Sequence, residues 1–395
     1  MNKFTKSKWI WTAEGECADS YAEFRDTLLY NGGEMTMHLS CDTDYTLYIN
    51  GCFVASNQYG DFEHYKIYDT LDITEHLTQG DNRIDILVYY CGVNTQRYRK
   101  APAGLLYEMI TDDEVVAYSS KATLSRLSPA YTNGRCLLVT PQLGFTFAYD
   151  ATKQSEEGFA PSVCVSKECR LFPRPVVKGV LLPEHPVASV TKYDDTHYLI
   201  DLGEEVVGLP TLDLVSATEQ NVMVAWGEHI DDGCVRTDHH SKHFYYEYRT
   251  VAGRNRFTDY MLRIAGRYLE VFSEEAIELH YVGILPQIIP VEEVPCRFDR
   301  EEDKRIYEIC IRTMKLCMME HYVDCPWREQ NLYALDARYI LDEIRKTYTM
   351  MLDAGSTTVW ETIKGAWDFS GNGSMCHAWS AVPVYVYHKL GIAKT

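Results

Sequence analysis

Residues 1 to about 150 carry short runs in which apolar and polar positions alternate, which is the period of a β-strand. The runs 46–49 and 52–55 flank Asn50-Gly51, a dipeptide typical of a two-residue hairpin turn. Residues 83–90 begin with alternation and end as a continuous apolar run, directly after turn residues. Short strands separated by turns about every ten residues predict a β-sandwich, of which a jelly roll is one form.

A second group of strands follows a proline-containing stretch. Five prolines interrupt residues 151–190, so this stretch is expected to form an irregular linker over the surface. Strand patterns then resume in three runs, at 197–202, 221–226 and 268–272. They end near Pro290 and predict a second β-sandwich.

The apolar period changes after Pro290 from two residues to between three and four. This spacing predicts one helix over 301–322, a second over 333–353 that ends at Gly355, and a third over 377–389. The sequence therefore predicts a multidomain β + α protein with four parts: an N-terminal jelly-roll sandwich over 1–150, a linker over 151–190, a second sandwich over 191–294 and a helical region over 295–395.

Composition narrows the class of protein. Apolar residues make up 46% of the chain and charged residues 24%, which is ordinary for a globular protein and excludes general disorder. The net charge of −19 makes nucleic acids and anionic membrane surfaces unfavourable partners. The 13 cysteines lack zinc-like spacing and, with no apparent secretory signal, favour reduced thiols and a cytoplasmic location. The 29 tyrosines are compatible with sugar binding, but on composition alone β-sheet propensity is the favoured explanation.

One segment combines several charged side chains. Asp324, Glu329 and Asp336 place three carboxylates within 13 residues around Arg328, on an expected loop after the first predicted helix. A carboxylate beside a cation stays ionised, whereas one against apolar surface has a raised pKa. Such a cluster can therefore supply one protonated acid and several hydroxyl-binding groups, as glycoside hydrolysis requires. The alternative is a solvated helix start with surface ion pairs.

The same segment resembles a family signature. Residues 323–330, followed by 333–336, are similar to the signature of the bacterial α-L-rhamnosidases, family 78 of the glycoside hydrolases. Further segments resemble other parts of that family, in the same order: 42–51 its jelly-roll domain, 201–208 and 227–229 its second β-domain, 353–361 the motif that carries the catalytic base, and 374–380 the next block.

The resemblance implies inverting hydrolysis of terminal α-L-rhamnosides, with Glu329 as the general acid and Glu361 as the general base. Inversion requires about 6.5–9.5 Å between the two carboxyl groups, so that a water molecule fits between base and sugar. The resemblance also assigns the substrate contacts: Asp324, Arg328 and Asp336 to the rhamnose hydroxyls, Trp327 and Trp360 to the apolar walls, and His377 to the pocket edge. It implies no metal and no cofactor.

The sequence departs from the family in its helical region. The family's (α/α)6 barrel has twelve helices, which need on the order of 190 residues, whereas about 90 residues follow Glu302. Glu329 and Glu361 are close in sequence, with an apparent junction near Ile340. The family's C-terminal β-domain has no counterpart. We therefore expect a truncated barrel remnant whose exposed apolar stripes favour a homodimer.

Two other functions remain open. A catalytically defective homologue would act as a carbohydrate-binding or vestigial β-sandwich protein, and a different glycan-active enzyme could use the same scaffold. Residues 238–243 are histidine-rich, but their spacing favours a turn over a metal site. Cys317 and Cys325 lack a supporting base and are expected to be structural thiols. His64 is a possible sugar contact, with a surface histidine as the alternative.

Overall fold

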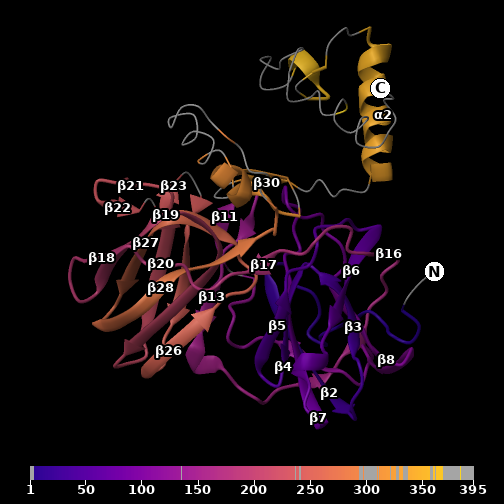
Figure 1. Cartoon of the computed structure of the whole chain (residues 1–395), viewed down its shortest axis with the longest axis horizontal. Helices are drawn as coiled ribbons and strands as arrows, with labels where there is room; N and C mark the ends of the chain where they lie inside the picture. The colour runs from indigo at the N-terminus through magenta and orange to yellow at the C-terminus, as the bar shows by residue number, and fades with distance from the viewer. Residues whose placement is uncertain are drawn as a thin grey trace. The chain divides into compact units, whose positions relative to one another are not determined.

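A computed structural model shows a mostly β protein with several sheets (Figure 1). It describes residues 4–134, 136–235, 237–239, 242–292, 297, 309, 311–320, 322–325, 329–331, 337–355, 359–360, 362–367 and 383. These residues form two compact units, Met1–Tyr333 and Ala334–Thr395. The first unit contains both predicted groups of strands.

Two sheets form the first sandwich. One sheet contains, in spatial order, β15 (Val163–Cys164), β1 (Ile10–Trp11), β8 (Gly104–Thr111), β3 (Thr36–Asp42), β6 (Tyr65–Asp72) and β16 (Arg170–Pro173), with β9 (Glu114–Tyr118) beside β8. The other contains β14 (Ala160–Pro161), β10 (Leu124–Leu127), β2 (Ser20–Tyr30), β7 (Gly80–Tyr90), β4 (Asp44–Ile49) and β5 (Cys52–Ser56). Inward residues of both sheets, such as Phe24, Leu39, Ile86 and Tyr107, share one apolar core.

The predicted Asn-Gly hairpin is confirmed. β4 and β5 pair with Ile49 opposite Cys52, which leaves Asn50 and Gly51 as the two turn residues. Both have positive φ angles, 53° and 79°. This left-handed pair matches the twist of the flanking strands, and Asn and Gly adopt it at low cost.

The second sandwich is built on one nine-stranded sheet. In spatial order the sheet contains β13 (Ala148–Asp150), β25 (Tyr245–Arg249), β20 (Asn221–Gly227), β27 (Ile264–Ser273), β19 (His197–Ser216), β28 (Ile277–Ile288) and β17 (Val180–Leu181). β18 (Ser189–Lys192) and β26 (Gly253–Thr258) also pair with β19, along different halves of this long strand. The three predicted strand runs after the linker are thus confirmed within β19, β20 and β27.

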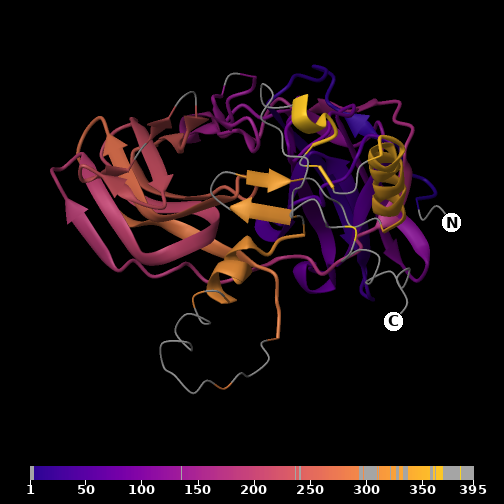
Figure 2. The ribbon, with the colours of Figure 1, turned by 90° about the horizontal axis from the view of Figure 1, so that it is seen from above.

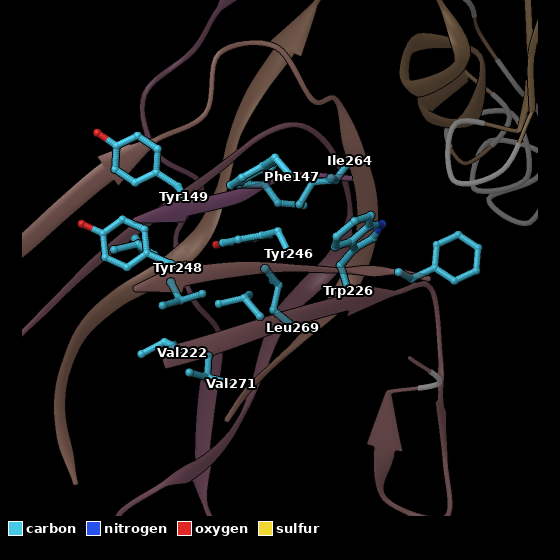
Figure 3. Packing of buried hydrophobic residues seen from close by; sticks show 14 of the residues in the cluster. Phe147, Tyr149, Val222, Trp226, Tyr246, Tyr248, Ile264, Leu269 and Val271 are labelled. Carbon is cyan, nitrogen blue, oxygen red and sulfur yellow. The ribbon is translucent and has the colours of Figure 1, made fainter. Parts of the chain in front are cut away.

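An aromatic cluster fills this second sandwich (Figure 3). The rings of Phe147 and Tyr246 stack with centroids 4.8 Å apart, and those of Tyr149 and Tyr248 stack at 5.7 Å. Trp226 is 1% exposed beside them. Phe147 and Tyr149 precede the linker, so the core of the second sandwich includes residues from the first 150 positions.

The two sandwiches are joined directly. Tyr21 and Tyr89 of the first sandwich belong to the same buried cluster as the second-sandwich core. Phe53 stacks on Tyr260 with ring centroids 4.0 Å apart. The hydroxyl of Tyr131 donates a hydrogen bond to Asp259 Oδ2 at 2.9 Å.

The linker also pairs with both sandwiches. β16 adds a parallel strand beside β6 in the first sandwich, and β17 adds an antiparallel strand beside β28 in the second. Most linker side chains are nevertheless exposed. Shorter elements complete the first unit: β11 (Leu138–Thr140), β12 (Gly144–Phe145), β21 (Ile230–Asp231), β22 (Cys234–Val235), β23 (Asp238–His239), β24 (Lys242–His243), η1 (Thr74–His76) and η2 (Ala151–Lys153).

The helical region corrects the fold prediction. Of the predicted helix over 301–322, the described residues 309 and 311–317 are helical, and a hairpin of β29 (Tyr322–Cys325) and β30 (Glu329–Asn331) comes after them (Figure 2). Asp324 and Glu329 therefore lie in strands rather than on the predicted loop. In the described residues no helical barrel is present.

The second unit contains α2 (Ala337–Asp353) and η3 (Gly365–Trp367). α2 confirms the second predicted helix, with Ile344 and Met351 buried. It ends as predicted at Gly355, whose φ is 74° and whose N–H donates to Leu352 O at 2.8 Å. The third predicted helix, 377–389, lies outside the described residues apart from position 383. No helix in the described part of the chain is long and apolar enough to cross a membrane.

Candidate functional site

A pocket lies between the two sandwiches of the first unit. We call it the inter-sandwich pocket. Its lining comes from four segments: Thr43, Asp44, 57–61, Lys66, Arg97 and Tyr98 of the first sandwich, Lys178 and Gly179 of the linker, Met261, Arg263 and 287–289 of the second sandwich, and Met319 and Glu320.

Lys66 stands at the centre of a buried ionic network on the first-sandwich side. Its side chain is 2% exposed, and Nζ lies 2.6 Å from Asp42 Oδ2 and 2.5 Å from Asp61 Oδ1. Asp42 also accepts hydrogen bonds from Lys167 Nζ at 2.7 Å and from the Tyr98 hydroxyl at 2.5 Å. Each buried charge in this group therefore has an opposite charge in contact, as burial requires.

The pKa values follow from this arrangement. Burial raises the pKa of Asp61 to about 6, although Lys66 opposes the shift. Burial acts in the same direction on Asp42, but Lys66 and Lys167 outweigh it and lower the pKa of that carboxyl. Burial alone would lower the pKa of Lys66, but Asp42 and Asp61 raise it. Lys66 therefore remains protonated at neutral pH.

A second ionic group centres on Asp69. Its carboxylate accepts from Arg174, from the Tyr45 hydroxyl and from Lys178 Nζ, the last at 2.9 Å. Arg174 also contacts Glu320, whose Oε1 accepts from the Gly179 N–H at 3.2 Å. This group connects β6, the linker and the segment that precedes β29. Arg174 of the linker therefore connects Asp69 of the first sandwich to Glu320, which lines the pocket.

Two arginines of the pocket differ in their partners. Arg97 Nη2 lies 2.7 Å from Asp44 Oδ2. Arg263 is 5% exposed, and its Nη2 makes a long hydrogen bond, 3.4 Å, to Leu316 O. Its Nε and Nη1 have no hydrogen-bond partner among the described residues. Burial lowers the pKa of Arg263 to about 9, and the charge of Arg97 acts in the same direction.

An unpartnered acceptor lies in the same pocket. Gln287, on β28, is 7% exposed, and its Oε1 has no hydrogen-bond partner in the described structure. Gln287 and Arg263 come from strand β28 and from the residue before β27, so the second sandwich supplies both groups. The described part of the chain contains no group of three or more His, Cys, Asp or Glu side chains arranged to hold a metal ion.

The residues that the sequence singled out are distributed over both units. Asp324 and Glu329 lie in the β29–β30 hairpin of the first unit, where Glu329 pairs with Cys325. Trp360 lies in the second unit and is partly buried. The remaining predicted site residues lie outside the described residues: Trp327, Arg328, Asp336, Glu361 and His377. The separation of the Glu329 and Glu361 carboxyl groups therefore stays a prediction.

Sequence reasoning did not find the inter-sandwich pocket. Lys66 lies between the apolar neighbours Tyr65 and Ile67 of β6, and a charged residue inside a buried strand is a usable signal. Arg263 and Gln287 carry no such local signal. The structure singles them out because polar atoms of both side chains are buried without hydrogen-bond partners among the described residues.

Comparison with known proteins identifies part of this scaffold. Residues 191–282 match the family model of the bacterial α-L-rhamnosidase concanavalin-like domain. This part of the chain is therefore similar to a domain of the bacterial α-L-rhamnosidases. No curated protein sequence matches the chain.

Solved rhamnosidases share the fold of most of the chain. The family 78 rhamnosidase of Bacillus sp. GL1 superposes with a TM-score of 0.71 at 14% identity, over 82% of this chain and 59% of that one. The α-L-rhamnosidase of Dictyoglomus thermophilum gives a TM-score of 0.70 at 16% identity, over 97% and 48%. The Streptomyces avermitilis α-L-rhamnosidase, solved with L-rhamnose, gives 0.67 at 14% identity, over 87% and 36%. The chain thus spans 36–59% of the length of these rhamnosidases.

Proposed function

We propose that this chain acts in the hydrolysis of terminal α-L-rhamnosides, as a glycoside hydrolase that inverts the anomeric centre. The observation that carries the proposal is the agreement of two comparisons: a rhamnosidase domain over 191–282, and a rhamnosidase fold over 82–97% of the chain. The signature around Asp324 and Glu329 supports the same activity. The proposed location is the cytoplasm, and the proposed partner is an L-rhamnose-containing glycoside.

The proposed mechanism uses two carboxyl groups. Glu329 protonates the glycosidic oxygen as the bond to the aglycone breaks, and Glu361 removes a proton from the water that attacks the opposite face of the sugar. The proposed substrate contacts are those of the signature: Asp324, Arg328 and Asp336 with the hydroxyls, Trp327 and Trp360 with the apolar faces, and His377 at the edge. This chemistry requires no cofactor.

Hydrolysis of an aryl α-L-rhamnopyranoside tests this proposal. We expect turnover by the purified chain, and a loss of about 10²–10⁴-fold in Glu329→Gln and in Glu361→Gln, because general acid and base catalysis contribute that much. Glu114→Gln, at an exposed position of β9, is the matched control and should retain full activity. NMR of the first product should show the inverted anomer. A folded, soluble protein without turnover would contradict the proposal.

A second function is carbohydrate binding without hydrolysis. The inter-sandwich pocket favours it, because tyrosines, amides and ion pairs line this pocket. Calorimetric titration with sugars separates the two functions. Binding by a protein that releases no aryl group would support binding alone, whereas absence of both would exclude both functions.

A further inference from the structure

We infer that the inter-sandwich pocket binds a small acidic sugar, whose carboxylate lies against Arg263 and one of whose hydroxyl groups donates to Gln287 Oε1. The inference refines the carbohydrate-binding function. The choice of a sugar as ligand depends on that function, whereas the requirement for a negative charge is argued from Arg263. It makes no use of the Glu329 and Glu361 pair.

The first argument is the state of Arg263. A buried guanidinium without a counter-charge is costly, because its five N–H donors lose water without gaining strong acceptors. Arg263 has one long hydrogen bond to a backbone carbonyl, while Nε and Nη1 have no partner among the described residues. A guanidinium in this state is suited to an anion, and carboxylates are the planar anions that match it best.

The second argument is the charge balance around the pocket. Five cations of the two ionic groups and of the Asp44 pair each contact at least one carboxylate: Lys66, Arg97, Lys167, Arg174 and Lys178. The carboxylates that they contact are Asp42, Asp44, Asp61, Asp69 and Glu320. Arg263 is a sixth cation. Within this described set, Arg263 is therefore the one cation that contacts no carboxylate.

The third argument is independent of charge. Gln287 Oε1 is a buried acceptor without a donor in the described structure, and it lines the same pocket as Arg263. A ligand that satisfies both residues needs an anionic acceptor and a hydroxyl or N–H donor. A simple inorganic anion such as sulfate supplies only the first.

The other walls of the pocket favour a sugar over a smaller hydroxy acid. Tyr59 and Tyr98 line the pocket, and aromatic rings pack against the C–H faces of pyranoses. A hexuronate combines a ring, several hydroxyls and one carboxylate.

A matched pair of ligands tests the inference on the intact chain. D-glucuronate and D-glucuronamide share the ring and differ in the carboxylate. We expect calorimetric binding of D-glucuronate to the native protein, at least tenfold tighter than that of the amide. Acetate and sulfate, at equal ionic strength, should bind at least tenfold more weakly than the glucuronate.

Variants locate the site. Arg263→Met should weaken D-glucuronate binding at least tenfold, and Gln287→Leu should weaken it about threefold. Arg256→Met is the control, because Arg256 belongs to the same sandwich and its side chain is 69% exposed. Arg263→Lys keeps the positive charge but loses the paired N–H donors of the guanidinium. It replaces Arg263→Met as the test variant if the methionine variant does not fold. The ligand-induced rise in melting temperature of the native protein gives a readout that needs no variant.

The outcomes are distinct. Equal binding of acid and amide, or equal binding to native protein and Arg263→Met, would overturn the inference and leave carbohydrate binding intact. No binding of any sugar would overturn both. If Arg263→Met melts at a clearly lower temperature and no acid binds the native protein, Arg263 is a structural residue and the inference is wrong. A variant that melts at an equal or higher temperature is expected, because the change removes an uncompensated charge.

Discussion

Stacked rings fill the second sandwich, whereas the first sandwich buries Asp42, Asp61 and Lys66 beside its apolar core. The ring cluster is built from apolar and aromatic side chains (Figure 3). The buried charges, in contrast, lie next to the inter-sandwich pocket. Apolar burial stabilises in proportion to its area, whereas a buried ion pair gives little net stability after desolvation. The apolar and aromatic clusters therefore stabilise the fold, whereas the buried charges of the first sandwich contribute to a polar site.

Removing the largest ring should give the largest effect. Trp226→Ala is expected to lower the free energy of unfolding by about 3–5 kcal/mol, because a fully buried ring leaves a cavity that close neighbours cannot fill. Urea denaturation measures the change. Val190→Ala, at a half-exposed position of β18, should change stability by less than about 0.5 kcal/mol. A small effect of Trp226→Ala would contradict the role assigned to the ring cluster.

A double-mutant cycle tests the ionic interior. Lys66→Met should cost about 3–5 kcal/mol, because it leaves Asp61 buried without its cation. Adding Asp61→Asn should recover at least about half of this loss, because the remaining groups no longer include an unpaired charge. Denaturant unfolding of the native chain, both single variants and the double variant measures the coupling. Additive losses would show that the two side chains act independently.

Glu205, a partly buried acid of the second sandwich, extends the comparison to the pH dependence of stability. Burial, with the neighbouring Glu228, raises the pKa of Glu205 to about 7, and Arg312 only partly offsets this. In an unfolded chain the pKa is about 4.3, so the folded state loses stability as pH rises from about 4 to 7. Glu205→Gln should therefore stabilise the protein by about 1–3 kcal/mol at pH 8, allowing for partial exposure, and by less than half of that at pH 5. Equal effects at both pH values would contradict the raised pKa.

The smallest effect concerns the joint between the sandwiches. Tyr131→Phe removes the hydrogen bond to Asp259 Oδ2 and keeps the ring, so it should cost about 1 kcal/mol. The remaining backbone donors to Asp259, from Met261 and Leu262, limit the loss. Tyr118→Phe, at an exposed position of β9, is the control. Thermal unfolding should remain a single transition, and its division into two would show that the sandwiches unfold separately.

Local patterns predicted local structure well. The Asn50-Gly51 turn and the end of α2 at Gly355 each depend on a few adjacent residues, and both are confirmed. The hairpin at Asp324 and Glu329 was wrongly predicted as a loop, because proline and charge clusters indicate a break in a helix but do not specify the next element. The charged pocket could not be predicted. No local sequence pattern shows that polar atoms of Arg263 and Gln287 are buried without hydrogen-bond partners among the described residues.

Strand β13 has a consequence for synthesis. Ala148 pairs with Glu247, so about 100 residues must leave the ribosome before this edge of the sheet can close. At a translation rate of about 5–20 residues per second, Phe147 and Tyr149 wait about 5–20 s for their stacking partners. During that interval two large rings are available to chaperones and to other nascent chains. The yield of folded protein should therefore respond to slower translation between codons 150 and 250.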